Sequence, residues 1–199
     1  MSDRPSLTDL DIRVALRPRV LQPHLGDPDT VLIEELGVCR GLARVDLAVV
    51  NGTIEGYEIK SDRDSLRRLE GQVDLFSKVL DRAVLVASPR HLDEALNIVP
   101  AWWGVLRVQG DLDGAVNFKV VRRGRKNRSR EARALVELLW MDEAVALLER
   151  HGHARGVRGK PRAQVWDRIC DTLDIELIAA EVRESLKARA AQRVVPPSA

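Results

Sequence analysis

The spacing of hydrophobic positions changes several times along the 199 residues, and each change marks a predicted element. Leucines and valines recur at near-helical spacing over about residues 7–21, with Pro18 near the end, and predict a first helix. The run 30–36 is short, apolar and partly β-branched, which is typical of a strand. Two alternating runs, 43–50 and 53–60, flank an Asn-Gly pair and predict a β-hairpin.

The segment after the hairpin predicts a parallel crossover. Ser61 to Asp64 offer N-cap side chains for a helix that runs to about Arg82. The continuously apolar run 83–87 is typical of a strand buried on both faces. Strand, helix and buried strand form a βαβ unit, so we expect an α/β fold with a mixed sheet flanked by helices. The elements that complete this layer are a helix near 90–99 and strands near 103–108 and 115–121.

The pattern changes again at a basic stretch, RRGRKNRSR. Beyond it only helices are predicted, over about 130–151, 161–173 and 175–190. The chain is therefore expected to divide into a core of residues 1–121, a basic linker of residues 122–130 and a helical extension of residues 131–195.

Charge and composition narrow the class of protein. Residues 1–121 carry 15 Lys and Arg against 19 Asp and Glu, whereas residues 122–199 carry 17 against 11. The acidic part suits a carboxylate site and the basic part a polyanionic partner, although solvated charged faces would give the same counts. Cys39 and Cys170 suit two reduced thiols, and no apolar run has the length of a membrane span. We therefore expect a cytoplasmic protein without a membrane partner.

The candidate chemistry lies in the hairpin, where Asp46 is followed by Glu58 and Lys60. Glu58 and Lys60 are two apart on a strand and must share a face. A two-residue loop would turn Asp46 away from Glu58, whereas a three-residue loop would place the two carboxylates directly opposite each other.

The distribution of side chains favours the three-residue loop, because it separates an apolar face from a charged one. A bulge could restore the same parity. The apolar face then holds Val45, Leu47, Val49, Tyr57 and Ile59. The charged face holds Arg44, Asp46, Ala48, Gly56, Glu58 and Lys60.

Two carboxylates at about 4.5–5.5 Å between Cβ atoms can hold one divalent cation, and oxygen ligands favour Mg²⁺ or Mn²⁺. A cation there would activate water and neutralise charge on a phosphodiester. Lys60 could orient that water and stabilise the transition state. The alternative is a surface hairpin whose ion pairs, such as Lys60 with Asp46, contribute little.

These residues resemble the motif of the PD-(D/E)XK nuclease superfamily and, within it, the bacterial sce7726 family. The segments that carry the resemblance are IEEL (33–36), RVDLAVVNG (44–52), GYEIKSDRDSLRRL (56–69), QVDLFSKVLDRAVLV (72–86), WWGVL (102–106) and two stretches of the helical extension, which we call the tail. One departure is that valine, not proline, precedes the first aspartate.

The resemblance implies a restriction-endonuclease-like core with Asp46 and Glu58 as metal ligands and Lys60 as the catalytic lysine. It also implies an upstream acid at Glu35, although strand parity leaves Glu34 as an alternative. Gln72 corresponds to a glutamine on the following helix, and from its position alone it could equally be a solvated helix-edge residue.

The tail resembles the helix–extended loop–helix of SAP-type DNA-binding modules, with Pro161 suited to start the second helix. A helical hairpin packed on the core is the alternative. The basic residues that would contact phosphates are Arg155, Arg158, Lys160 and Arg162, and in the linker Arg123 and Arg125.

The sequence therefore predicts a nuclease that hydrolyses DNA with Mg²⁺ or Mn²⁺, in repair, recombination or defence. An inactive DNA-binding or scaffold protein and an RNA-directed nuclease are the alternatives. A homodimer or a partner protein is compatible with this prediction.

Overall fold

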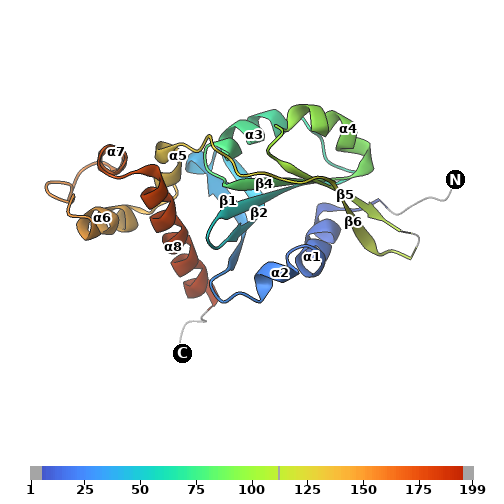
Figure 1. Cartoon of the computed structure of the whole chain (residues 1–199), viewed down its shortest axis with the longest axis horizontal. Coiled ribbons are helices and arrows are strands. Elements are labelled where there is room, and N and C mark those ends of the chain that lie inside the picture. Colours follow the sequence, from blue (N-terminus) through green and yellow to red (C-terminus); the bar gives the residue numbers. More distant parts are fainter. Residues whose placement is uncertain (1–5, 112, 195–199) are drawn as a thin grey trace.

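The computed structural model describes residues 6–111 and 113–194, which form a six-stranded mixed sheet and eight α-helices (Figure 1). This arrangement confirms the predicted α/β class. The strands are β1 (Val31–Val38), β2 (Ala43–Val50), β3 (Ile54–Lys60), β4 (Arg82–Ala87), β5 (Gly104–Gly110) and β6 (Val116–Arg122). The helices are α1 (Asp9–Arg19), α2 (Gln22–Leu25), α3 (Leu69–Ser77), α4 (Pro89–Ile98), α5 (Ala132–Val136), α6 (Met141–Arg150), α7 (Arg162–Thr172) and α8 (Ile175–Val194).

The strands lie in the sheet in chain order, from β1 to β6. β1, β2 and β3 are antiparallel neighbours, β3, β4 and β5 are parallel, and β6 returns antiparallel to β5. The strand–helix–strand unit predicted after the hairpin is therefore present as β3–α3–β4. A short 3₁₀ turn, Cys39–Gly41, joins β1 to β2.

Helices cover both faces of the sheet (Figure 1). α3 and α4 lie over one face, where Phe76 and Trp103 stack in the larger apolar core. α1 covers the other face, with Ile12 and Leu16 fully buried in the smaller core. Thr8 caps α1 through a reciprocal hydrogen-bonded box with Asp11. No helix among the residues described here combines the length and apolar character that crossing a bilayer requires.

The helix after the hairpin is shorter than predicted, since it begins at Leu69 and not near Ser61–Asp64. The Asp64 carboxylate accepts hydrogen bonds from both the backbone N–H (2.7 Å) and the hydroxyl (2.6 Å) of Ser61. These local bonds hold a turn in place of a first helical turn. The predicted apolar face is confirmed, because its four side chains are all buried: Leu69, Val73, Phe76 and Leu80.

Of the tail helices, α8 packs against β1 and β2, and buried side chains of all four belong to the larger core. The prediction of a single helix over 130–151 is wrong, because the helical structure is interrupted between α5 and α6. Glu143 accepts the backbone N–H of Trp140 at 2.7 Å and so starts a new helix there. Leu138 and Leu139 are buried within the break, whereas the Trp140 side chain is half exposed.

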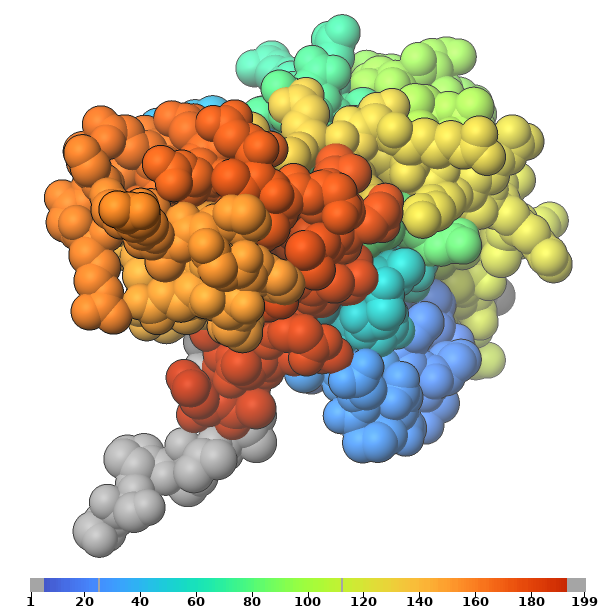
Figure 2. Space-filling model, turned by 60° about the vertical axis from the view of Figure 1, so that its left-hand side comes forward, coloured from blue at the N-terminus to red at the C-terminus, as the bar shows by residue number. Residues whose placement is uncertain are grey.

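Residues 122–130, which we call the basic strap, lie extended against the core and lead into the tail (Figure 2, yellow into orange). The buried Asn127 side chain donates to the carbonyls of Ser77 (2.7 Å) and Leu80 (2.8 Å). Arg130 forms a buried ion pair with Asp81 at 2.9 Å. The Arg122 side chain also donates to the Trp103 carbonyl, so the stretch predicted as a linker is anchored in both halves, while Arg123 and Arg125 remain exposed. Residue 195, the last of the predicted extension, lies outside the described residues.

Candidate functional site

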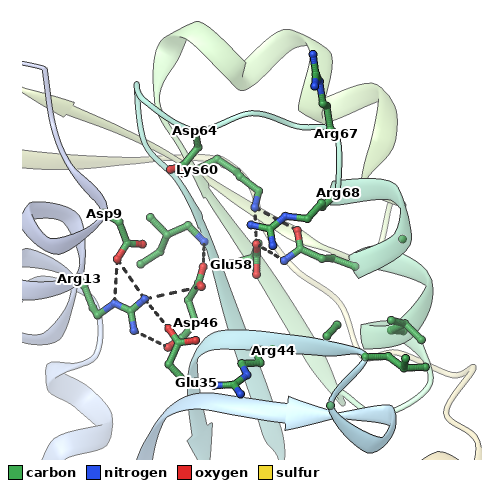
Figure 3. A pocket seen from close by; sticks show the side chains of 17 residues that line it. Asp9, Arg13, Glu35, Arg44, Asp46, Glu58, Lys60, Asp64, Arg67 and Arg68 are labelled. Carbon is green, nitrogen blue, oxygen red and sulfur yellow. Dashed lines mark hydrogen bonds and ion pairs between the residues drawn. The ribbon is translucent and has the colours of Figure 1, made fainter.

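A cleft of about 640 Å³ opens where β3 ends, between α1 on one side and the start of α3 on the other (Figure 3). The sheet contributes its floor through β2 and β3. All five residues predicted to take part in catalysis line this cleft: Glu35, Asp46, Glu58, Lys60 and Gln72. Residues from four elements, β1, β2, β3 and α3, are thus brought to one place.

The hairpin has the predicted three-residue loop, with Val50 opposite Ile54 and Leu47 opposite Tyr57. Regular pairing stops there. At the next position, the side chain of Asp46 bonds to β3: its Oδ2 accepts the Ile59 backbone N–H at 2.7 Å. The two strands separate at this point, and the Asp46 carboxylate lies in the opening that results.

A distortion in β1 accompanies this opening. Glu35 has a φ of 53° and interrupts the β1–β2 ladder between the Glu34–Leu47 and Leu36–Val45 pairs. The assignment of Val45 to the same face as Leu47 is therefore wrong, because Val45 packs in the opposite core. Strict alternation along β2 fails where the strand twists past the cleft.

Glu58, Lys60 and Gln72 form a closed triangle of hydrogen bonds. Lys60 Nζ donates to Glu58 Oε1 at 2.5 Å and to Gln72 Oε1 at 3.1 Å. Gln72 Nε2 donates to the same Glu58 oxygen at 2.7 Å. Glu58 and Lys60 therefore share a face as predicted, and α3 brings Gln72 over them. Glu58 Oε2 is buried and has no hydrogen-bond partner among the residues that the structure describes.

Arg13 on α1 is a site residue that the sequence did not reveal. Its guanidinium donates to Glu35 Oε1 at 3.0 Å and to the Asp46 carbonyl at 3.0 Å, and it lies 3.8 Å from Asp46 Oδ1. Asp9, four residues earlier, holds it at 3.1 Å. Of the two adjacent acids, Glu35 lines the cleft, whereas Glu34 pairs with Arg17 outside it.

The two strand carboxylates lie in an unfavourable environment for negative charge. Burial and the neighbouring Asp46 raise the pKa of Glu58 to about 7. Burial also raises the pKa of Asp46 to about 6, against the opposing effect of the Ile59 N–H. A cation between them would relieve this repulsion.

The donor set fits a hard cation that keeps part of its own hydration. No group of three or more His, Cys, Asp or Glu side chains within the described ranges is arranged to hold a metal ion. Mg²⁺ is commonly held by one or two carboxylates together with waters and substrate phosphates. Asp46 and the unpartnered Oε2 of Glu58 supply such a pair, whereas Glu35 is engaged by Arg13.

The raised pKa values predict a stability that falls with pH. Carboxyl groups in the unfolded chain titrate near pH 4, so Glu58 and Asp46 bind protons more tightly in the folded protein. The stability that the two protonated carboxyl groups contribute is complete below about pH 4 and is lost as the pH rises through 6 to 7. In urea unfolding with EDTA, we expect the wild type to lose on the order of 2 kcal/mol between pH 5 and pH 8. A curve equally steep for Asp46→Asn would contradict this assignment.

The basic residues predicted to bind nucleic acid do not line the cleft. Arg125 donates its backbone N–H to Trp102, and Asn127 bonds to Asp81 just before β4. The basic strap therefore lies near the start of β4, whereas Lys60 pairs with Ala87 at the end of that strand. The four tail residues of this predicted set are exposed and lie on the α6–α7 loop or at the start of α7. They are Arg155, Arg158, Lys160 and Arg162.

Comparisons with known proteins identify the family. Residues 10–194 match the family described as bacteriophage P4 protein cII. Protein cII of Enterobacteria phage P4 is 36% identical over 97 residues, which make up 49% of this chain and only 36% of the phage protein. The solved structure of the SPO1766 protein of unknown function from Silicibacter pomeroyi is 23% identical, with a TM-score of 0.44 over 81% of this chain and 99% of that one. Because the family match spans nearly all of the sequence, this chain belongs to the bacteriophage P4 protein cII family.

Proposed function

We propose that this protein hydrolyses phosphodiester bonds in DNA with the help of Mg²⁺ or Mn²⁺. The observation that carries the proposal is the convergence of Asp46, Glu58 and Lys60 with Gln72 in one open cleft. A buried and a partly buried carboxylate with raised pKa values beside a lysine are a costly arrangement, and such arrangements gather at functional sites.

Each residue has a role that its contacts support. Asp46 and Glu58 would hold the cation, which when bound supplies an activated water and neutralises charge on the phosphate. Lys60 has three ammonium donors, of which Glu58 and Gln72 accept two. The third is free to orient a water or to donate to a phosphate oxygen as charge develops. Gln72 fixes the rotamers of both charged side chains.

The order of elements is consistent with a restriction-endonuclease-like core, which the resemblance to PD-(D/E)XK nucleases implies. An antiparallel hairpin leads directly into the β3–α3–β4 crossover, and the acidic and basic motif residues lie on the hairpin. We extend this interpretation to the tail, whose α6–loop–α7 segment would act as the SAP-like part.

A second function is a nucleic-acid-binding protein that does not cut. Arg13 already provides Glu35 and Asp46 with a cation of the protein's own, and this observation favours the alternative. RNA in place of DNA is the third candidate and requires the same chemistry.

Cleavage of labelled single-stranded, double-stranded and branched DNA and of RNA, with Mg²⁺ or Mn²⁺, tests the proposal. We expect Asp46→Asn to lose cutting by at least about a thousandfold, because one of two cation ligands is neutralised. Glu34→Gln is the matched control, since it removes an acid outside the cleft, and it should cut like the wild type. Mg²⁺ should also raise the melting temperature of the wild type but not of Asp46→Asn. Binding without cutting by all three proteins would favour the second function.

A further inference from the structure

Three arginines form the rim of the cleft, and we call them the arginine rim: Arg44, Arg67 and Arg68. Arg44 comes from β2, and the other two come from the loop that precedes α3. All three are exposed, and none forms an ion pair with another residue in the described part of the chain. Figure 3 shows Arg44 on one side of the carboxylate pair and Arg67 and Arg68 on the other.

None of the acids that line the cleft forms an ion pair with these three arginines, and each has contacts elsewhere in the described part of the chain. Arg13 holds Asp9 and Glu35. Glu58 accepts from Lys60 and Gln72, and Asp46 accepts from the Ile59 N–H. Asp64 accepts two hydrogen bonds from Ser61. Three arginines therefore line one cleft without an ion-pair partner in the described part of the chain.

The tail offers a contrast. Arg158 pairs with Glu149 at 2.8 Å, and Arg162 lies 5.6 Å from the centre of the Trp166 ring. These side chains have partners within the protein, and they are remote from the carboxylates. An external anion would gain more from the rim, where guanidinium forks can bind phosphate oxygens in pairs.

We propose that the arginine rim binds the backbone phosphates of one nucleic-acid strand on both sides of the Asp46–Glu58 pair. This inference rests on the proposed function, because it assigns the strand that the carboxylates would cut. The strand crosses the cleft between Arg44 and the loop that carries Arg67 and Arg68. The tail contributes a weaker and separate contact.

Fluorescence anisotropy of the 199-residue chain in EDTA, with labelled single-stranded DNA, duplex DNA and single-stranded RNA, measures this binding without hydrolysis. The rim variant carries Arg44→Gln, Arg67→Gln and Arg68→Gln. We expect its Kd to rise at least about tenfold, and the slope of log Kd against log salt to fall by about two to three. The matched control removes the same charge from the tail with Arg155→Gln, Arg158→Gln and Arg162→Gln, and its slope should change by less than about one.

Gly71 provides a second variant that leaves charge unchanged. It lines the cleft within α3, and a Cβ there would meet nothing within 4 Å. Gly71→Leu should therefore preserve the melting temperature, since leucine favours a helix more than glycine does. Its side chain would occupy the path of the strand and weaken binding at least about tenfold.

An unchanged salt slope in the rim variant, an equal loss in the tail control, or no binding of any probe by the wild type would overturn the inference. Failure of the proposed function looks different. If the wild type never cuts but the rim variant loses binding, the rim stands and the nuclease does not. If the wild type cuts and the rim variant binds normally, the opposite holds. A preference among the three probes identifies the type of strand.

Discussion

Lys60→Met should reduce the rate of cleavage by about a thousandfold while changing the Kd for DNA by no more than about threefold. Methionine keeps the apolar stem, which is almost fully buried, and removes only the ammonium group. That group contacts Glu58 at 2.5 Å and has one donor left for the reacting atoms. The interaction is made chiefly in the transition state, so its loss should appear in kcat and not in substrate binding. Single-turnover cleavage and anisotropy measure the two quantities separately.

Arg63→Met is the matched control, because Arg63 is an exposed cation in the adjacent loop that does not line the cleft. It should leave kcat unchanged. The melting temperature of both variants must be recorded, since Lys60→Met removes the cation beside the buried Glu58. A pKa of about 7 allows Glu58 to take up a proton, so the variant should be better folded at pH 6 than at pH 8. Equal losses of binding and of kcat by Lys60→Met in folded protein would remove the transition-state role.

The parts of the site that follow from local pattern were predictable. Two-residue periodicity put Glu58 and Lys60 on one face, and the separation of polar from apolar positions selected the three-residue loop. The helical spacing of Leu69, Val73 and Phe76 was also sufficient to find the buried face of α3. Each of these features depends on residues that are close in sequence, where backbone geometry alone fixes the relation between side chains.

The parts that depend on tertiary contacts were not predictable from one sequence. Arg13 lies 33 residues before Asp46 in the chain. It reaches Asp46 only because α1 packs across the face of the sheet opposite to α3. An Asp–Arg pair spaced four apart at positions 9 and 13 looks like an ordinary helix ion pair. Val45 packs in the core opposite to the predicted one because Glu35 adopts a positive φ. The hydrophobic periodicity of the sequence gives no sign of this distortion. The clustering of Arg44 with Arg67 and Arg68 likewise needs the hairpin, the loop and α3 in place.

Asp81→Ala should lower the free energy of unfolding by about 3–5 kcal/mol. Asp81 lies just before β4 with 3% of its side chain exposed, and its Oδ2 accepts the Ile54 N–H at 2.8 Å. Its other oxygen pairs with Arg130, which is 5% exposed, at 2.9 Å. Removing the carboxylate leaves a buried guanidinium and a buried backbone donor with fewer partners. Urea unfolding at pH 7 measures the loss.

The double variant Asp81→Ala with Arg130→Met tests whether the pair acts as a unit. Its loss should be smaller than the sum of the two single losses by at least about 1 kcal/mol, because the second change removes the stranded charge. Additive losses would show that each residue acts alone. Asp81 precedes β4, whereas Lys60 and the cleft lie beside its far end. Cleavage per folded molecule should therefore survive both changes at low temperature, and a loss of activity without unfolding would place the basic strap within the catalytic apparatus.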